Sequence, residues 1–305
     1  MKNALIANSR GEDAMALATR RWAVVCLLIA LITTSRGQAW GEERTSKQRA
    51  LFETFLSEFV SVRPGEEGFP DSLKVESLAQ DDSKDPQTIV IPFTNPFQIS
   101  KYEVYQDLYE AVMGENPSRW KGPRNSAERI SHEDAVEFCT RLTSILREEN
   151  LIGETQVVRL PTETEWLYCA KGGTNTAYSF GDNPRLDGDQ GTQASRLDDY
   201  AWHTGNAAGN DPAVGVLKPN LFGLYDIHGY LWEYCLDDWT PDFPGGRTTQ
   251  DGLFRSSTST EVTIRGGSWK DPYSLLRLKT RKPFPKAGGD DAVGFRCVLV
   301  EARAR

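Results

Sequence analysis

The sequence has few histidines, few cysteines and no recognisable hydrolase or nucleotide motif. Its 305 residues include 3 His and 5 Cys, and no C-x-x-C pair occurs, so zinc and thiol-redox motifs have no support. His132, His203 and His228 do not form an i, i+4 pair, and we expect each to be hydrogen-bonded or on the surface. G-x-S-x-G, P-loop and H-E-x-x-H motifs are also absent, which removes the usual signatures of those enzyme classes.

Positive charge is scarce as well. The formal net charge is −8, with 43 Asp and Glu against 35 Lys and Arg. Residues 1–39 hold five basic and two acidic side chains, so the remainder of the chain carries −11. Such a surface repels phosphate backbones and anionic lipid headgroups. We therefore expect no nucleic-acid partner.

Long apolar runs are absent except near the N-terminus. Arg20 and Arg21 precede an apolar stretch at 22–32 that is too short to span a bilayer comfortably, and residues 37–39 (Gly-Gln-Ala) resemble a signal-peptidase site. This pattern predicts a signal peptide at 1–39 and export to the periplasm or the cell exterior. An uncleaved N-terminal anchor is the alternative. After cleavage we expect no membrane span.

Hydrophobic periodicity predicts a helical lead-in at 40–57 and three later helices. These should cover about 105–113, 131–149 and 162–171, and Ser131 and Thr162 are candidate N-caps of the last two. Strands are expected at 59–62, 88–93, 97–104, 231–234, 263–265 and 295–300. Residues 174–223 show no periodicity, and a loop of that length is usually functional or held by a bound ion.

A colinear series of short segments carries a family resemblance. The segments are 101–104 (KYEV), 112–118 (VMGENPS), 134–139 (DAVEFC), 159–166 (RLPTETEW), 170–173 (AKGG), 180–182 (FGD), 219–226 (PNLFGLYD), 229–234 (GYLWEY), 265–269 (RGGSW) and 293–297 (VGFRC). Together they resemble the formylglycine-generating-enzyme, or sulfatase-modifying-factor, family, with the domain at 58–302. The resemblance implies an α+β, C-type-lectin-like fold that is rich in loops and has little regular secondary structure.

The resemblance also implies a chemistry for which this chain lacks the ligands. Enzymes of the family convert a sulfatase cysteine to formylglycine, using oxygen and a copper ion held by two cysteines just after the RGGS segment. Residues 265–281 contain no cysteine, and none lies between Cys235 and Cys297. Cu(I) favours soft thiolates, so we do not expect copper here and expect no catalytic residue. Ser268 and Asp271 are the weak candidates for altered chemistry.

Calcium is the metal that the resemblance still implies. Its ligands would be the side chain of Asp226 and the backbone carbonyls of Ile227, Gly229 and Leu231, because hard oxygen ligands in a tight turn suit Ca²⁺. Tyr230 stands where the family usually has Asn. A turn held by its own hydrogen bonds is the alternative. A second, weaker acidic set comprises Asp198, Asp199, Asn206, Asn210 and Asp211.

Four cysteines remain after signal removal, and the sequence alone leaves three full pairings open. The family resemblance implies a disulfide between Cys139 and Cys297. Cys169 matches another half-cystine position of the family, whose usual partner falls at Leu278. It is therefore free or paired with Cys235, and we favour a free, buried thiol.

Three functional hypotheses follow from this sequence. The first is a non-catalytic module that binds an exported protein or peptide. The family groove would then involve Trp232, Ser268, Trp269, Arg277 and Arg281. Core packing is the alternative role, and the two arginines could also be paired on the exterior. The second is an enzyme with altered oxidative or maturation chemistry on a protein or small molecule. The third is a structural or adhesion part of the cell envelope. The oligomeric state is left open.

Overall fold

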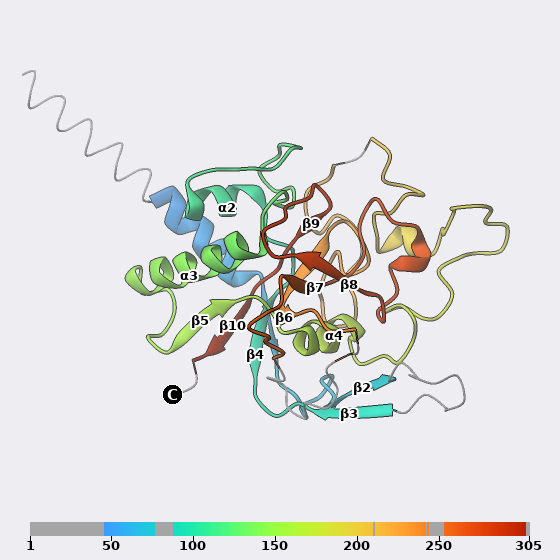
Figure 1. The fold of residues 1–305 in the computed structure, drawn as a ribbon, viewed down its shortest axis with the longest axis horizontal. Helices are drawn as coiled ribbons and strands as arrows, with labels where there is room; N and C mark the ends of the chain where they lie inside the picture. Colours follow the sequence, from blue (N-terminus) through green and yellow to red (C-terminus); the bar gives the residue numbers. More distant parts are fainter. Residues whose placement is uncertain (1–45, 77–87, 210, 242, 244–252, 303–305) are drawn as a thin grey trace, which may run out of the picture. The chain divides into compact units, whose positions relative to one another are not determined.

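The computed structural model describes residues 46–76, 88–209, 211–241, 243 and 253–302 (Figure 1). The chain divides into two compact units, Met1–Leu51 and Phe52–Arg305, and the architecture below is that of the second. Helical backbone covers 46–57. The predicted signal peptide and the first part of the lead-in lie outside the described residues. Among the residues described, no helix has the length and apolar character needed to cross a bilayer.

The three predicted helices form close to their expected limits. They are α2 (Gln106–Met113), α3 (His132–Glu148) and α4 (Glu163–Lys171). Ser131 and Thr162 each accept a hydrogen bond from the backbone N–H three residues ahead, and the side chain at that position bonds back to the cap. These are complete capping boxes, which satisfy backbone donors that the first helical turn leaves unpaired. The local sequence therefore places both helix starts.

Within the residues that the structure describes, ten strands form three sheets. The first sheet is antiparallel and joins, in spatial order, β1 (Phe59–Val62), β4 (Phe97–Ser100), β10 (Val298–Glu301) and β5 (Gln156–Arg159). The second is the antiparallel pair β2 (Ser72–Glu76) and β3 (Thr88–Pro92). The third runs β8 (Arg281–Pro285), β7 (Glu261–Arg265), β6 (Trp232–Asp238) and β9 (Val293–Gly294), with β9 parallel to β6.

The described strands and the predicted ones differ at several places. β2, β8 and β9 were not among the predicted strands, and the strand expected at 295–300 pairs over Val298–Glu301. β8 reads Arg-Lys-Pro-Phe-Pro, which has little strand propensity, yet all five of its residues pair with β7. Distant partners, rather than local propensity, therefore define these short strands.

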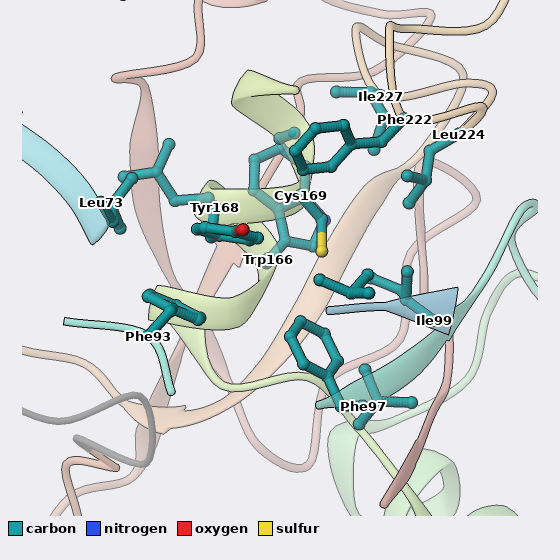
Figure 2. Close-up of a cluster of buried hydrophobic side chains, with 14 of the residues drawn as sticks. Leu73, Phe93, Phe97, Ile99, Trp166, Tyr168, Cys169, Phe222, Leu224 and Ile227 are labelled. Atoms are coloured by element: carbon teal, nitrogen blue, oxygen red, sulfur yellow. The ribbon is translucent and has the colours of Figure 1, made fainter. Parts of the chain in front are cut away.

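Aromatic side chains fill much of the main core, around α4 (Figure 2). Tyr168 stacks on Phe93 with ring centroids 4.1 Å apart, and its hydroxyl donates to the carbonyl of Pro70. Trp166 is 1% exposed, and its indole N–H donates to Glu233 on β6. The helix thereby contacts both the β2–β3 side of the core and the β6–β7 sheet, as Figure 1 shows.

The long segment at 174–223 folds without strands of its own. Apart from Asn210, which is not described, its one regular element is the 3-10 helix η1 (Leu197–Asp199). Phe180 stacks between Tyr178 and Tyr200, at 5.4 and 4.5 Å. Aromatic stacking and loop hydrogen bonds therefore order this segment, which forms a second small apolar cluster.

Candidate functional site: an aromatic, acidic pocket beside the RGGS segment

Two glycines let the RGGS segment pass close to its neighbours. Gly266 and Gly267 have φ of 98° and 80°, in the left-handed region that favours glycine. A Cβ on Gly267 would lie 2.8 Å from the side chain of Leu276. The segment is thus pressed against the chain that follows it.

Ser268 and Asp271 form a closed hydrogen-bond arrangement. The Oδ2 atom of Asp271 accepts from the Ser268 hydroxyl at 2.6 Å, from the Ser268 N–H at 3.1 Å and from the Trp232 indole at 2.7 Å. Ser268 is 1% exposed and Asp271 9%. The Oδ1 atom of Asp271 also lies 3.7 Å from the ammonium of Lys282. Both side chains therefore bond to groups of the protein, and they hold the turn after the RGGS segment.

The residues of this window do not fit a copper ion. Asp271 already accepts three donors, and Leu276 is apolar and buried. Cys169 and Cys235 belong to the main apolar core, where burial raises the pKa of both thiols well above the usual range. Cu(I) sites in proteins use thiolate or thioether ligands. We therefore derive no chemistry through copper at this place.

The structure brings together three of the five predicted groove residues. Trp232, Ser268 and Trp269 are adjacent, although Trp232 and Ser268 are buried. Arg281 belongs to a different network: its guanidinium pairs with buried Glu163 at 2.7 Å and lies 4.4 Å from the ring centre of Trp239. The Nε of Arg277 is buried and has no hydrogen-bond partner among the described residues. Arg281 therefore makes its contacts with Glu163 and Trp239, and a groove role for the two arginines stays a prediction.

A pocket of about 200 Å³ opens beside Trp269. Its aromatic lining is completed by Trp120, Trp202 and Tyr230, and its acidic lining consists of Glu128, Asp211 and Asp291. Sequence analysis did not single out Trp120, Trp202 or Glu128. The tryptophans stand in loop segments with no periodicity, and their convergence depends on contacts between segments far apart in the chain.

The Asp226 turn has an unusual backbone. Asp226 and Tyr230 have φ of 59° and 70°, and a Cβ on Gly229 would lie 2.3 Å from the carbonyl oxygen of Trp202. Asp226 is 2% exposed and accepts from the N–H of Gly215 at 2.8 Å. Burial raises the pKa of its carboxyl to about 6. The carbonyl oxygens of Ile227 and Leu231 both face Gly266.

This geometry leaves both interpretations of the turn open. The hydrogen bond from Gly215 supports a turn that is held by the protein itself, whereas the buried Asp226 carboxylate and the carbonyls of Ile227 and Leu231 are hard oxygen groups of the kind that calcium takes. In the described residues, no group of three or more His, Cys, Asp or Glu side chains is placed to hold a metal ion. The predicted set has one carboxylate, so calcium binding at Asp226 stays a prediction.

The weaker acidic set is gathered only in part. Asp198 and Asn206 both bond to His203, at 2.8 and 2.9 Å, whereas Asp199 pairs with Lys218 at 2.8 Å. Asp211 lines the pocket, and Asn210 lies outside the described residues. The contacts of the described members are to groups of the protein, and a shared ion at this set stays a prediction.

The three histidines and the four cysteines of the described residues lie in the interior. His132 bonds to the carbonyl of Cys235, and His228 bonds to the Leu276 carbonyl and to Ser179. The sulfur atoms of Cys139 and Cys297 lie 3.9 Å apart as free thiols. The structure thus juxtaposes the predicted disulfide pair, and the bond itself stays a prediction.

Comparison with known proteins agrees with the fold and the motifs. Residues 47–300 match the model of the sulfatase-modifying factor enzyme 1-like domain. A chaperone protein LppX of Paenibacillus barcinonensis is 30% identical over 247 residues, covering 66% of this chain and 79% of the relative. A formylglycine-generating enzyme of Thermomonospora curvata is 29% identical over 204 residues, covering 62% and 60%. The solved structure of PvdO from Pseudomonas aeruginosa superimposes with a TM-score of 0.63 at 22% identity, covering 80% of this chain and 94% of PvdO.

Proposed function

Because the chain belongs to the sulfatase-modifying factor enzyme 1-like family, we propose that it is a non-catalytic member that binds an exported protein or peptide. The observation that carries the proposal is the closed contact between Asp271, Ser268 and Trp232. It occupies the window in which the enzymes of the family hold copper by two thiolates. The fold is retained, and hydrogen bonds that hold a turn stand in place of a soft-metal site.

Two further observations support a binding role. The pocket beside Trp269 is concave and mostly aromatic, with a few convergent polar groups, which is typical of ligand sites in proteins. The relative from Paenibacillus barcinonensis is named a chaperone, and chaperones act on other polypeptides. Both observations are consistent with a polypeptide partner that places one of its side chains in this pocket.

A copper titration tests the non-catalytic part of the proposal. We expect no stoichiometric Cu(I) binding and no aldehyde on a cysteine-bearing sulfatase peptide incubated with the protein and oxygen. Asp271→Asn should behave in the same way as the natural protein. Stoichiometric Cu(I) binding together with aldehyde formation would make the protein an enzyme and end this proposal.

Capture of partners from the exported fraction tests the binding part. Trp269→Ala, on the pocket wall, should lose a partner that the natural protein retains. Leu221→Ala is the matched control because Leu221 is 76% exposed and does not line the pocket. Equal capture by the two variants would contradict binding at this pocket.

Export itself is part of the proposal. The apolar stretch at 22–32 and the small residues at 37–39 support removal of residues 1–39 at a signal-peptidase site. Sequencing the N-terminus of the protein recovered outside the cytoplasm should give Trp40 as the first residue. Recovery of the intact N-terminus in the membrane fraction would instead indicate an uncleaved anchor.

Calcium binding at the Asp226 turn is proposed as a structural role. If Ca²⁺ binds there, added CaCl₂ should raise the midpoint of thermal unfolding of the natural protein, because a ligand of the folded state stabilises it. Asp226→Asn should remove that rise, and an equal concentration of MgCl₂ should not reproduce it. An unchanged midpoint in the natural protein would leave a turn held by its own hydrogen bonds.

A further inference from the structure

The pocket beside Trp269 contains two polar atoms whose hydrogen-bonding capacity is unused. Glu128 is 3% exposed, and its Oε1 accepts from the backbone N–H groups of Arg119 and Trp120. Among the described residues, neither its buried Oε2 nor the buried indole N–H of Trp202 has a hydrogen-bond partner. Most buried polar groups in proteins are hydrogen-bonded, because leaving one unpaired is costly. Both atoms therefore point to a ligand that completes them.

The charge of the pocket favours a cation. In the described part of the chain, no ion pair joins Glu128 or Asp211 to a basic side chain, whereas Asp291 is paired with Lys270 and Arg119. Asp211 accepts from Asn125 and lies 3.4 Å from the Tyr230 hydroxyl. Two carboxylates thus face a space walled by tryptophan and tyrosine rings. Aromatic faces attract cations, and a desolvated carboxylate does so more strongly.

The number of N–H donors on the ligand distinguishes between three kinds of organic cation. A quaternary ammonium has no N–H and could not donate a hydrogen bond to Glu128 Oε2. A guanidinium binds best when both carboxylate oxygens accept, but Oε1 is already occupied by two backbone donors. A primary ammonium is a compact charge with three donors, and a single free oxygen suits it.

We infer that this pocket binds a primary ammonium group, in the form of a lysine side chain of the partner polypeptide. The ammonium donates to Glu128 Oε2, and the alkyl stem packs between the aromatic walls. The Trp202 N–H is then available to a carbonyl of the same ligand. The inference rests on the proposed binding function and adds the chemistry by which one residue of the partner is recognised.

Small analogues test this chemistry without the partner. Nα-acetyl-lysine N-methylamide is titrated into the full protein and followed by tryptophan fluorescence, because three tryptophans line the pocket. The norleucine, trimethyllysine and arginine analogues are titrated in parallel. We expect the lysine analogue to bind about tenfold or more tightly than the norleucine analogue, as a charge-assisted hydrogen bond requires. Equal binding of lysine and norleucine analogues, or tighter binding of trimethyllysine or arginine, overturns the inference.

Two pocket variants and one control locate the binding. Glu128→Gln should weaken lysine-analogue binding about tenfold or more, and Trp202→Phe should weaken it less, because it removes one neutral donor. Glu137→Gln removes a charge from an exposed position on α3 outside the pocket and should leave binding unchanged. Circular dichroism confirms that each variant is folded. If Glu128→Gln and Trp202→Phe both bind as the natural protein does, the inference is wrong.

The two proposals fail in different ways. If no analogue binds but Trp269→Ala still loses the partner, the ammonium inference is wrong and the binding function stands. If the lysine analogue binds but partner capture is indifferent to Trp269→Ala, the pocket chemistry stands and the proposed partner function is wrong.

Discussion

At the scale of single residues, Glu233 and Arg296 form a fully buried ion pair. The guanidinium donates to both carboxylate oxygens, at 2.5 and 2.8 Å, and also to the carbonyls of Ser100, Lys101 and Tyr225. The same guanidinium is the counter-charge for a group of buried acids. Burial raises the pKa of the Glu103 carboxyl well above its usual range, and the negative charges of Glu233 and Asp226 add to the effect.

Replacing Arg296 with methionine should therefore strongly lower the free energy of unfolding. The change removes the positive charge that Arg296 supplies to that acid cluster, and breaking a buried pair costs about 3–5 kcal/mol. Chemical denaturation monitored by circular dichroism measures the loss. Arg141→Met is the control, since Arg141 pairs with Glu137 on the exposed face of α3 and should change stability by no more than about 1 kcal/mol. Similar losses in the two variants would contradict this account.

His132 should make stability depend on pH. Burial lowers the pKa of its imidazole to about 4, against about 6.5 in an unfolded chain. Between these two pH values the unfolded state binds more protons than the folded state. The contribution of the neutral His132 imidazole to folding stability is therefore fully present above about pH 6.5 and is lost as the pH falls toward 4. Between pH 7 and pH 5, His132 should account for about 2 kcal/mol of lost stability. His132→Gln should show a correspondingly smaller difference between denaturant titrations at the two pH values, and an identical difference would argue against a buried neutral imidazole.

At the scale of elements, the helix caps make local contributions that can be measured separately. The Ser131 hydroxyl accepts from the N–H of Asp134 at 3.0 Å, and Asp134 bonds back to the cap. Ser131→Ala should destabilise the protein by about 1 kcal/mol in denaturant titrations. Ser144→Ala, in the exposed middle of α3, should be close to neutral. A larger effect at Ser144 than at Ser131 would count against the capping box as the start of this helix.

At the scale of the whole molecule, Cys139 on α3 and Cys297, just before β10, are placed close enough for us to predict a disulfide between them. They are 158 residues apart in sequence and 3.9 Å apart in space. In an exported protein we expect them to oxidise, and a loop of this length would add about 3–5 kcal/mol if the bond is unstrained. Peptide mapping without reductant should find this pair linked and Cys169 free. Reductant should lower the unfolding midpoint of the natural protein and not that of Cys139→Ser.

The sequence by itself determined the local features and the family. The caps at Ser131 and Thr162, the limits of α2, α3 and α4, and the absence of cysteine from 265–281 depend on residues close together in the chain, which a linear pattern records. The order of the RGGSW segment and the other nine family segments along the chain was sufficient to indicate the fold. That set is specific as a whole, although each segment alone is weak evidence for the family.

Only the tertiary structure decided the strand partners and the site. β8 pairs against its own propensity, Arg281 lies with Glu163 instead of Trp232, and Trp120, Trp202 and Trp269 meet around one pocket. Each of these outcomes depends on contacts between segments that are remote in sequence. Such contacts form because the shared core and its buried hydrogen bonds stabilise them together. They therefore cannot be predicted from the sequence of any single segment.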